Sequence, residues 1–282
     1  MIFRYPGGKS RLIDQLLPFI RTPIEETGRF ADLFVGGGSV LLAVARDYPN
    51  IPLWANDADR NISAFWQMVA GEGDADALCA MLRTPPTVPL FLRLRAEEPT
   101  SLEERAYRAV FFNRTTFSGI ASSGPIGGYA NQENTKWKID CRYNSEALVN
   151  EFGRMRVSLA GRLRATRKDA VAMVGELAEW ALYLDPPYFD KGDMLYPVQF
   201  SREQHRALAS ILRSRVNWML SYDDHPGIRG LYDWAIIDNT LRPRYSIEIE
   251  KEKRHRKTEL VITPRGQKVR RLLEQSAIAY QT

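Results

Sequence analysis

The spacing of apolar residues divides the N-terminal part of the chain into helices and strands. Apolar side chains recur at helical spacing between positions 12 and 20, which predicts a helix with Ser10 as its N-cap. Apolar runs at 29–34 and 51–55 predict two strands, and between them lie a glycine loop and a helix that opens at Ser39. Strand, glycine loop, helix and strand in this order predict a βαβ unit and a parallel sheet.

The middle of the chain, after a helix expected at about 59–69, has a different pattern. It shows helical patches but no clear strands, and residues 118–134 form a loop-rich segment dense in Gly, Ser and Asn. We therefore predict an α/β catalytic domain made of residues 1–70 and 162–282. A mostly helical insertion, residues 71–161, interrupts it.

Beyond the insertion, strands and helices alternate again. The expected elements are strands at 181–184, 218–222 and 234–238 and a helix at 201–214. Near the end, apolar residues alternate with polar ones from Tyr245 to Glu250, and Leu260 and Ile262 repeat the alternation after a charged tip. This pattern predicts a C-terminal antiparallel hairpin between the two segments.

One expected strand ends at the run Asp-Pro-Pro-Tyr, residues 185–188. The prolines stiffen this loop. Pro187 also removes an N–H that would compete for the acceptors, so the loop presents hydrogen-bond acceptors to a ligand. The exocyclic amino nitrogen of a nucleobase is a poor nucleophile because its lone pair is delocalised into the ring. The Asp185 carboxylate and the Pro186 carbonyl can accept its two N–H bonds, while Tyr188 can stack on an extruded base. The run therefore predicts methylation of such an amino group.

A glycine loop, Gly36 to Gly38, lies between an expected strand and the helix that opens at Ser39. Glycine lets the backbone approach a ligand closely, and a helix N-terminus offers N–H groups. Asp57 ends the next expected strand, where an acid can accept hydrogen bonds from both hydroxyls of a ribose. The spaced G-x-G-x-x-G pattern is absent, which favours a nucleoside cofactor smaller than a dinucleotide. The loop taken alone is equally compatible with a structural turn.

A second glycine run, Pro-Gly-Gly-Lys at residues 6–9, stands near the N-terminus. Walker-type phosphate binding does not fit, because the four-residue spacer and second glycine are missing and no strand precedes the run. We expect Lys9 instead to pair with a carboxylate, such as that of a methionine moiety.

Composition narrows the class of protein. The chain has 282 residues, a net charge of +5 and a pI of about 9.2. This moderate positive charge slightly favours polyanionic partners. Cys79 and Cys141 do not form a disulfide framework, and no Cys/His cluster has metal spacing, so no metal is expected. Neither a signal core nor a membrane-spanning run is present, so the expected location is the cytoplasm, with no membrane partner.

Two basic regions predict contacts with nucleic acid. The expected hairpin tip contains Lys253, Arg254, Arg256 and Lys257. Phosphate contact competes there with a solvated turn. The insertion interleaves cationic with aromatic side chains: Arg114, Lys136, Lys138 and Arg142 with Phe117, Tyr129, Trp137 and Tyr143. This mixture suits backbone contact plus base contact or intercalation, although core packing accounts equally well for any one of the aromatic residues.

Together these motifs resemble the Dam-type DNA adenine-N6 methyltransferases, class I S-adenosylmethionine-dependent enzymes with the alpha motif order. The matching segments are residues 5–9, 32–39, 56–57, 113–114, 117–119, 185–188, 200–205 and 258–263. Their order (cofactor motif, target-recognition insertion, catalytic motif) is more specific than any single segment. The resemblance implies a Rossmann-like class I methyltransferase sheet of the α/β class, which carries the antiparallel hairpin and the helical insertion.

The resemblance also implies roles for individual residues. Around S-adenosylmethionine it places Tyr5, Gly8, Lys9, Asp32, Phe34, Gly36, Gly38, Ser39, Asp57, Asp169 and Asp185. It makes Asp185, Pro186, Pro187 and Tyr188 catalytic, acting on an adenine flipped out of double-stranded DNA. For DNA contact the expected residues are Arg114, Ser118, Lys136 and Arg142, together with the hairpin tip. We expect a monomer encoded by a prokaryote or a phage.

Two rival interpretations stay open at this point. One is an enzyme on the same fold that methylates RNA or a protein glutamine amide. The other is a catalytically silent nucleic-acid-binding protein. Glutamine-directed relatives usually carry Asn in place of Asp185 and lack the large insertion, and an intact catalytic run argues against a silent protein.

Overall fold

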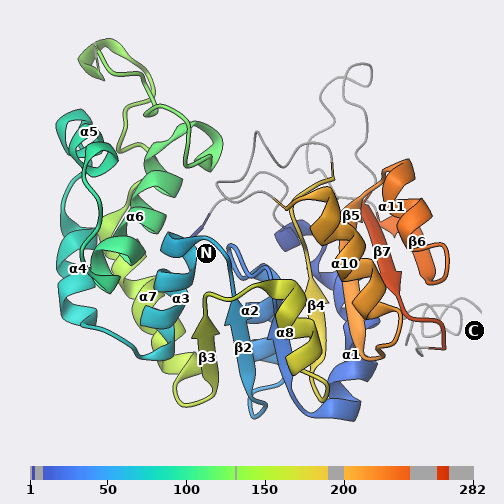
Figure 1. Ribbon diagram of the computed structural model, residues 1–282. Helices are drawn as coiled ribbons and strands as arrows, with labels where there is room; N and C mark the ends of the chain where they lie inside the picture. Colours follow the sequence, from blue (N-terminus) through green and yellow to red (C-terminus); the bar gives the residue numbers. More distant parts are fainter. Residues whose placement is uncertain (1, 4–8, 131, 190–199, 242–258, 267–282) are drawn as a thin grey trace, which may run out of the picture.

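The computed structural model describes residues 2–3, 9–130, 132–189, 200–241 and 259–266. Its centre is a sheet flanked by helices, and a helical lobe stands beside one edge of that sheet (Figure 1). Tyr5, Gly8 and all four basic residues of the expected hairpin tip lie outside the described residues.

The described residues form a seven-stranded sheet in the order β3-β2-β1-β4-β5-β7-β6. The strands are β1 (Phe30–Asp32), β2 (Leu53–Asn56), β3 (Leu163–Thr166), β4 (Ala181–Leu184), β5 (Trp218–Asp223), β6 (Ile236–Leu241) and β7 (Glu259–Thr263). The first five of the spatial order run parallel, and β7 is antiparallel to both of its neighbours. Because β1, β2, β4 and β5 are buried on both faces, neighbouring residues such as Leu182 and Tyr183 enter two different cores.

Helices cover both faces of the sheet. On one face lie α1 (Ile13–Thr27), α2 (Ser39–Asp47) and α3 (Arg60–Ala70), and on the other α8 (Ala170–Glu176), α10 (Arg202–Leu212) and α11 (Pro226–Leu231). Asp59 caps α3, since its carboxylate accepts the N–H groups of Asn61 and Ile62 at 2.7 and 3.1 Å. Helices therefore cover both faces of the central strands.

The lobe beside β3 contains α4 (Ala75–Arg83), α5 (Val88–Ala96), α6 (Leu102–Thr115) and α7 (Ser145–Leu159) (Figure 1). Its apolar residues share one continuous core with the first face of the sheet. Phe65 of α3, for example, packs against Phe152 of α7 with ring centroids 6.1 Å apart. Helix α3 thus anchors the lobe to the sheet, while the division of the chain into two domains stays a prediction.

The structure confirms the βαβ unit and the helix that opens at Ser39, but it corrects the start of α1. Residues Lys9–Arg11 form a 3-10 turn, α1 begins at Ile13, and the preceding Leu12 offers no side-chain cap. The prediction that Ser10 is the N-cap is therefore wrong. A polar residue near a helical pattern marks its vicinity, but the turn at Lys9–Arg11 shifts the first α-helical residue downstream.

Strand β3 and helix α8 were not expected from the sequence. In β3 only Leu163 and Ala165 point inward, so the run is too short to show strand periodicity. Arg164 between them is exposed, and its guanidinium lies 4.0 Å from the centroid of the Trp54 ring on the neighbouring strand. The strand is held by pairing with β2 and by this cation–π contact.

The C-terminal antiparallel pair is present, but its strands differ from those expected. Strand β7 pairs with β6 on one side and β5 on the other, with Ile262 opposite Ile237 and Leu220. Pairing of Leu260 and Ile262 with the segment that starts at Tyr245 is therefore wrong, because both edges of β7 are occupied. Residues 245–250 themselves lie outside the described residues.

Candidate active site at the carboxyl edge of the sheet

Three acidic residues follow from the topology of the central strands. Asp32 is the last residue of β1, Asp57 follows β2, and Asp185 follows β4. Since these three strands are parallel neighbours, with Asp32 in register with Tyr183, their carboxyl ends meet at one edge of the sheet. Ligands of open α/β sheets bind at this edge, so the sequence-predicted acids are brought together where a site is expected.

The glycine loop after β1 is shaped by a tryptophan. Gly36 and Gly38 have φ values of +45° and +69°, which only glycine adopts without strain. The indole N–H of Trp66 donates a hydrogen bond to the Gly36 carbonyl at 2.9 Å. A Cβ at Gly38 would lie 2.1 Å from the Trp66 ring. Trp66, from α3, therefore fixes the loop that leads into α2 at Ser39, a role that the sequence alone did not indicate.

Asp57 ties the glycine loop to the second strand. Its Oδ2 accepts the N–H of Gly36 and its Oδ1 accepts the N–H of Asp59, each at 2.9 Å. Burial raises the pKa of Asp57 to about 7, and the charge of Asp59 adds to the effect. Each carboxylate oxygen has room for a further hydrogen bond, so Asp57 can still accept ligand hydroxyls.

Asn56 connects the loops that follow three strands. Its amide group donates to the carbonyls of Leu33 and Lys168 at 3.2 and 3.1 Å, and its side-chain oxygen accepts the N–H of Lys168 at 2.9 Å. Asp169, the next residue, is exposed and caps α8 by accepting the N–H of Ala172 at 2.8 Å. Asp169 therefore lies at the same edge of the sheet as the other acids.

Asp32 is a buried carboxyl group next to the glycine loop. It is 2% exposed, and its Oδ1 accepts the N–H of Phe34 at 3.4 Å. Burial raises its pKa well above the ordinary value, and the nearby charge of Asp185 contributes. The Phe34 ring is half-buried and packs edge-on against Phe200, with centroids 5.5 Å apart.

Asp185 is held from two sides. Its Oδ1 accepts the Ser221 hydroxyl hydrogen bond at 2.8 Å and lies 2.8 Å from Nζ of Lys9. Pro186 is buried and Pro187 is half-buried. Tyr188 is 6% exposed, with the Lys9 ammonium 5.9 Å from its ring centroid. A base can stack on this ring only if neighbouring side chains move aside.

Lys9 lies in this site and is itself buried, at 5% exposure. Its Nζ contacts Asp185 at 2.8 Å and Oε1 of Glu259 at 3.0 Å. Burial alone would lower the pKa of Lys9, but the two carboxylates outweigh it and hold that pKa well above the ordinary value. Burial raises the pKa of Glu259 to about 7 against the opposing charge of Lys9. Lys9 thus pairs with carboxylates of the protein itself.

Ser221, Tyr183 and Glu259 belong to the site but were given no role from the sequence. Ser221 and Tyr183 occupy the middle of β5 and β4, where a polar side chain and a tyrosine are hard to tell from ordinary core residues. Glu259 begins a strand whose other residues are buried and mostly apolar. An acid at the start of such a strand is the signal that could have identified it.

The DNA-contact residues expected in the insertion lie in different environments. Arg114 is half-buried, and its Nε donates to the main-chain carbonyl of Ile2 at 2.6 Å. Ser118 is exposed in a left-handed conformation, φ +57°, beside Phe117, which is 70% exposed. Lys136 and Arg142 are exposed too. Arg114 therefore joins the lobe to the N-terminus, while the other three face outward.

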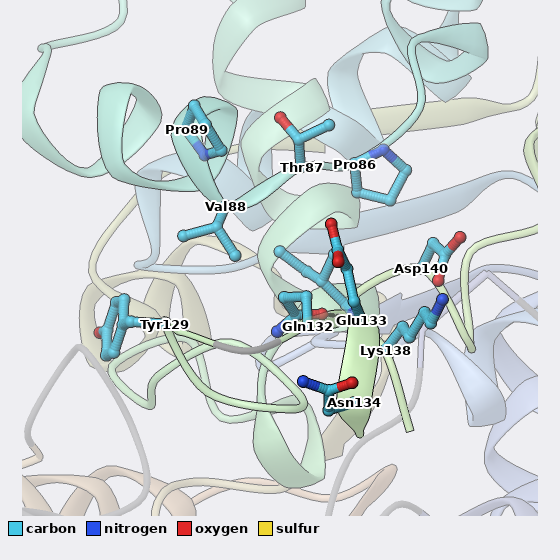
Figure 2. Close-up of a pocket in the computed structure, with 11 residues that line it drawn as sticks. Pro86, Thr87, Val88, Pro89, Tyr129, Gln132, Glu133, Asn134, Lys138 and Asp140 are labelled. Carbon is cyan, nitrogen blue, oxygen red and sulfur yellow. Dashed lines mark hydrogen bonds between the residues drawn. The ribbon is translucent and has the colours of Figure 1, made fainter. Parts of the chain in front are cut away.

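A cavity of about 540 Å³ lies within the insertion (Figure 2). It is bounded by residues 86–89, where α5 begins, by Tyr129, and by residues 132–134 and 138–140. None of the acids of the strand edge contributes to it. This cavity is therefore separate from the candidate active site.

Among the described residues, no group of three or more His, Cys, Asp or Glu is placed to hold a metal ion. In the same part of the chain no helix is long and apolar enough to cross a membrane.

An open sheet in this order, with a glycine loop after the first strand and acids at the carboxyl edge, has the class I methyltransferase architecture. The chain belongs to the family of D12 class N6 adenine-specific DNA methyltransferases, whose model matches residues 5–255. None of the curated proteins compared with the chain matches it. The protein is accordingly an enzyme that methylates adenine N6 in DNA, which confirms the expected activity. Methylation of RNA or of a protein amide, and a silent binding role, are not favoured.

Proposed function

We propose that the carboxyl edge of the sheet binds S-adenosylmethionine and that Asp185 acts on the target amino group beside it. Membership of the family implies this methyl donor. The residues proposed to surround it are Lys9, Asp32, Phe34, Gly36, Gly38, Ser39, Asp57, Asp169 and Asp185, with Tyr5 and Gly8 outside the described residues.

The charges at this edge support a cationic ligand. Asp32, Asp57 and Asp185 gather there, and Lys9 contacts Asp185 and also Glu259, which offsets part of the Lys9 charge. The raised pKa values of Asp32 and Asp57 indicate negative charge that burial makes unfavourable. A bound sulfonium and an α-ammonium group would relieve it. When bound, the donor supplies an electrophilic methyl group, and Asp57 is suited to hold ribose hydroxyls.

The observation that carries the proposal is the position of Asp185. It stands just past a central strand with Oδ1 engaged by Ser221 and Lys9, which leaves Oδ2 for a substrate. We infer that Oδ2 and the Pro186 carbonyl accept the two N–H bonds of the adenine amino group. Its nitrogen lone pair then withdraws from the ring and becomes nucleophilic. Positioning of the two reactants provides most of the acceleration.

The insertion is suited to hold double-stranded DNA while one adenine leaves the stack. Phe117 and Trp137 are 70% and 61% exposed, and the Lys136 ammonium lies 5.4 Å from the centroid of the Trp137 ring. Exposed aromatic rings next to cations are typical of surfaces that stack on bases and contact phosphates. We propose that a monomer binds the duplex in this way, in the cytoplasm of a prokaryote or of a phage-infected cell.

The test is transfer of labelled methyl groups from S-adenosylmethionine to DNA by the wild type and by Asp185→Ala. The variant should remain folded, bind the methyl donor measurably and lose about 10³-fold or more of its rate, since it lacks an acceptor aimed at the reacting nitrogen. Asp224→Ala is the matched control: Asp224 also follows a strand of this sheet but pairs with Arg229 at 2.7 Å. Near-normal turnover by Asp185→Ala would refute the proposed site. Long-read sequencing of DNA from expressing cells would give the methylated sequence.

A further inference from the structure

Both contacts that hold the Asp185 side chain reach the same oxygen. Ser221 donates to Oδ1 at 2.8 Å, and Nζ of Lys9 lies 2.8 Å from that atom. Within the described part of the chain, Oδ2 accepts no hydrogen bond. A carboxylate fixed through one oxygen turns its other oxygen in a single direction, so the groups behind Ser221 and Lys9 decide where Oδ2 points.

Behind Ser221 stands Tyr183. The Tyr183 hydroxyl lies 2.8 Å from Oγ of Ser221, and both side chains are buried. Burial raises the pKa of Tyr183 well above its ordinary value, and the charge of Asp185 adds to this, so the phenol keeps its proton. Ser221 gives its own hydrogen to Asp185 and therefore accepts from Tyr183. Such a chain of hydrogen bonds polarises its members and strengthens the last bond.

Behind Lys9 stands Glu259, 8% exposed, with Oε1 3.0 Å from Nζ. Glu259 is the first residue of β7 and pairs with Asp223 of β5, two residues after Ser221. The same pair of antiparallel strands thus delivers both supports. Without Glu259, the whole attraction of Lys9 would fall on Asp185 and weaken Asp185 as an acceptor for a substrate.

We propose that Ser221 and Glu259 are positioning residues for Asp185, Ser221 by direct contact with Oδ1 and Glu259 through Lys9, so that Oδ2 alone meets the adenine amino group. Ser221 acts by orienting the carboxylate, and Glu259 acts by dividing the charge of Lys9 between two acids. The inference rests on the proposed function, because it concerns the same Asp185. It assigns to these two residues no contact with DNA or with the methyl donor.

The first experiment compares Ser221→Ala with the wild type in single-turnover methylation at saturating DNA and S-adenosylmethionine. The rate should fall about 10- to 100-fold, the usual effect of losing a hydrogen bond to a charged group, while KM for DNA and donor affinity by calorimetry stay within about twofold. The control is Ser63→Ala, because Ser63 is equally buried but donates within its own helix, to the Arg60 carbonyl at 3.1 Å. It should keep the wild-type rate.

A purely structural role of Ser221 needs a separate variant, since Ser221→Ala leaves the buried Tyr183 hydroxyl without its partner. The double variant Tyr183→Phe/Ser221→Ala removes that hydroxyl and should recover much of any lost thermal stability. Its methylation rate should stay as low as that of Ser221→Ala. Recovery of the rate together with the melting temperature would overturn the positioning role.

Glu259→Gln tests the second support through the pH profile. Lys9, Asp185 and Asp223 are the charged groups around Glu259. With its pKa at about 7, the wild-type rate at saturating donor should rise from pH 6 to 8 as Glu259 ionises and takes its share of Lys9. In Glu259→Gln this rise should disappear, at unchanged donor affinity. An unchanged pH profile would overturn the role of Glu259. If these variants behave as the wild type while Asp185→Ala is inactive, only this inference fails; active Asp185→Ala would refute the proposed function itself.

Discussion

The carboxyl edge of the sheet and the outer surface of the insertion hold their polar side chains in opposite ways. At the edge, Lys9 contacts two carboxylates, and Asp57 and Asp185 each engage two protein groups. On the insertion, the rings of Phe117 and Trp137 are mostly exposed. A chemical site must be arranged before the substrate arrives, because reorganisation during the reaction is costly. A surface that follows a duplex can leave its contacts unmade until binding.

Side-chain hydrogen bonds nonetheless hold part of the insertion's backbone. The side-chain amide of Gln132 donates to the carbonyls of Ile126 and Gly128 at 2.9 and 2.6 Å, and its oxygen accepts the N–H of Ile139 at 2.9 Å. One glutamine thereby closes the loop that leads to Trp137. At the sheet edge the side chains are paired within the protein, whereas on the insertion the backbone is hydrogen-bonded and the aromatic side chains remain exposed.

The largest effect on the acid edge, apart from loss of Asp185 itself, should come from Asp57→Ala. The variant removes the acceptor for Gly36 and Asp59 and for the proposed ribose hydroxyls. Donor binding should weaken by about 1.5–3 kcal/mol, the usual loss for a hydrogen bond to a charged group. Calorimetric titration with S-adenosylmethionine measures this directly. Unchanged affinity would mean that Asp57 serves the loop alone.

Gly38→Ala probes how tightly the glycine loop is packed. The new methyl group would lie 2.1 Å from the Trp66 ring, and the left-handed backbone at this position, φ +69°, would be strained for alanine. Gly28→Ala is a matched control, since Gly28 has φ +66° but a Cβ there would have no neighbouring atom within 4 Å. We expect the control to lose about 1–2 kcal/mol of unfolding free energy from strain alone, and Gly38→Ala to lose more. If chemical denaturation gives equal losses of unfolding free energy for the two variants, the Trp66 ring moves aside at little cost.

Donor affinity should also depend on pH at this edge. Asp57 is ionised only above a pKa of about 7 in the free enzyme, and the ionised form is the better acceptor and the better partner for a cation. Affinity should therefore rise about tenfold between pH 6 and 8, and Asp57→Asn should lose most of this rise. The sign is opposite for stability. A raised carboxyl pKa stabilises the free protein at low pH, so the contribution of Asp57 to stability should fall as the pH rises from 3.8 to about 7, which the difference in melting temperature between the wild type and Asp57→Asn measures.

The sequence predicted the acid edge better than its supports, for a physical reason. Strand ends can be located from apolar runs and glycines, so Asp57 and Asp185 could be placed at strand ends from the residues alone. Asp32 came from the resemblance, because the expected strand at 29–34 runs past the observed end of β1 at Asp32. Ser221 reaches Asp185, and Glu259 reaches Lys9, only because β5 pairs with both β4 and β7, and pairing of distant segments leaves no periodic signal. Trp66 likewise meets the glycine loop through tertiary packing.

The same limit explains the fold-level errors. Strand β3 has two inward apolar residues, too few for a period, and it is recognised only once β2 stands beside it. The alternation near Tyr245 predicts that segment as the partner of β7. In the structure β6 pairs with β7 instead, and the burial pattern of β6 shows no regular alternation. Alternation of apolar and polar residues shows which face of a strand is buried. The partner of that strand depends on which other strand lies next to it in the fold.

The smallest expected effect concerns the outward surface of the insertion. If Lys136 and Arg142 meet phosphates, each acts as a point charge that contributes affinity without reading sequence. Converting both to Ser should weaken DNA binding several-fold at physiological salt and reduce the slope of log affinity against log salt by about 0.9 per contact. The rate at saturating DNA should be unchanged, because Asp185 keeps all its supports. Arg46→Ser/Arg154→Ser is the control pair, since those exposed arginines already face Asp47 and Glu151 at 2.8 and 2.5 Å. The Lys136/Arg142 variant could instead lose its rate at saturating DNA while keeping its salt slope. The insertion would then take part in arranging the catalytic edge. In that case the contrast between a preformed site and a surface that makes its contacts only on binding would not hold.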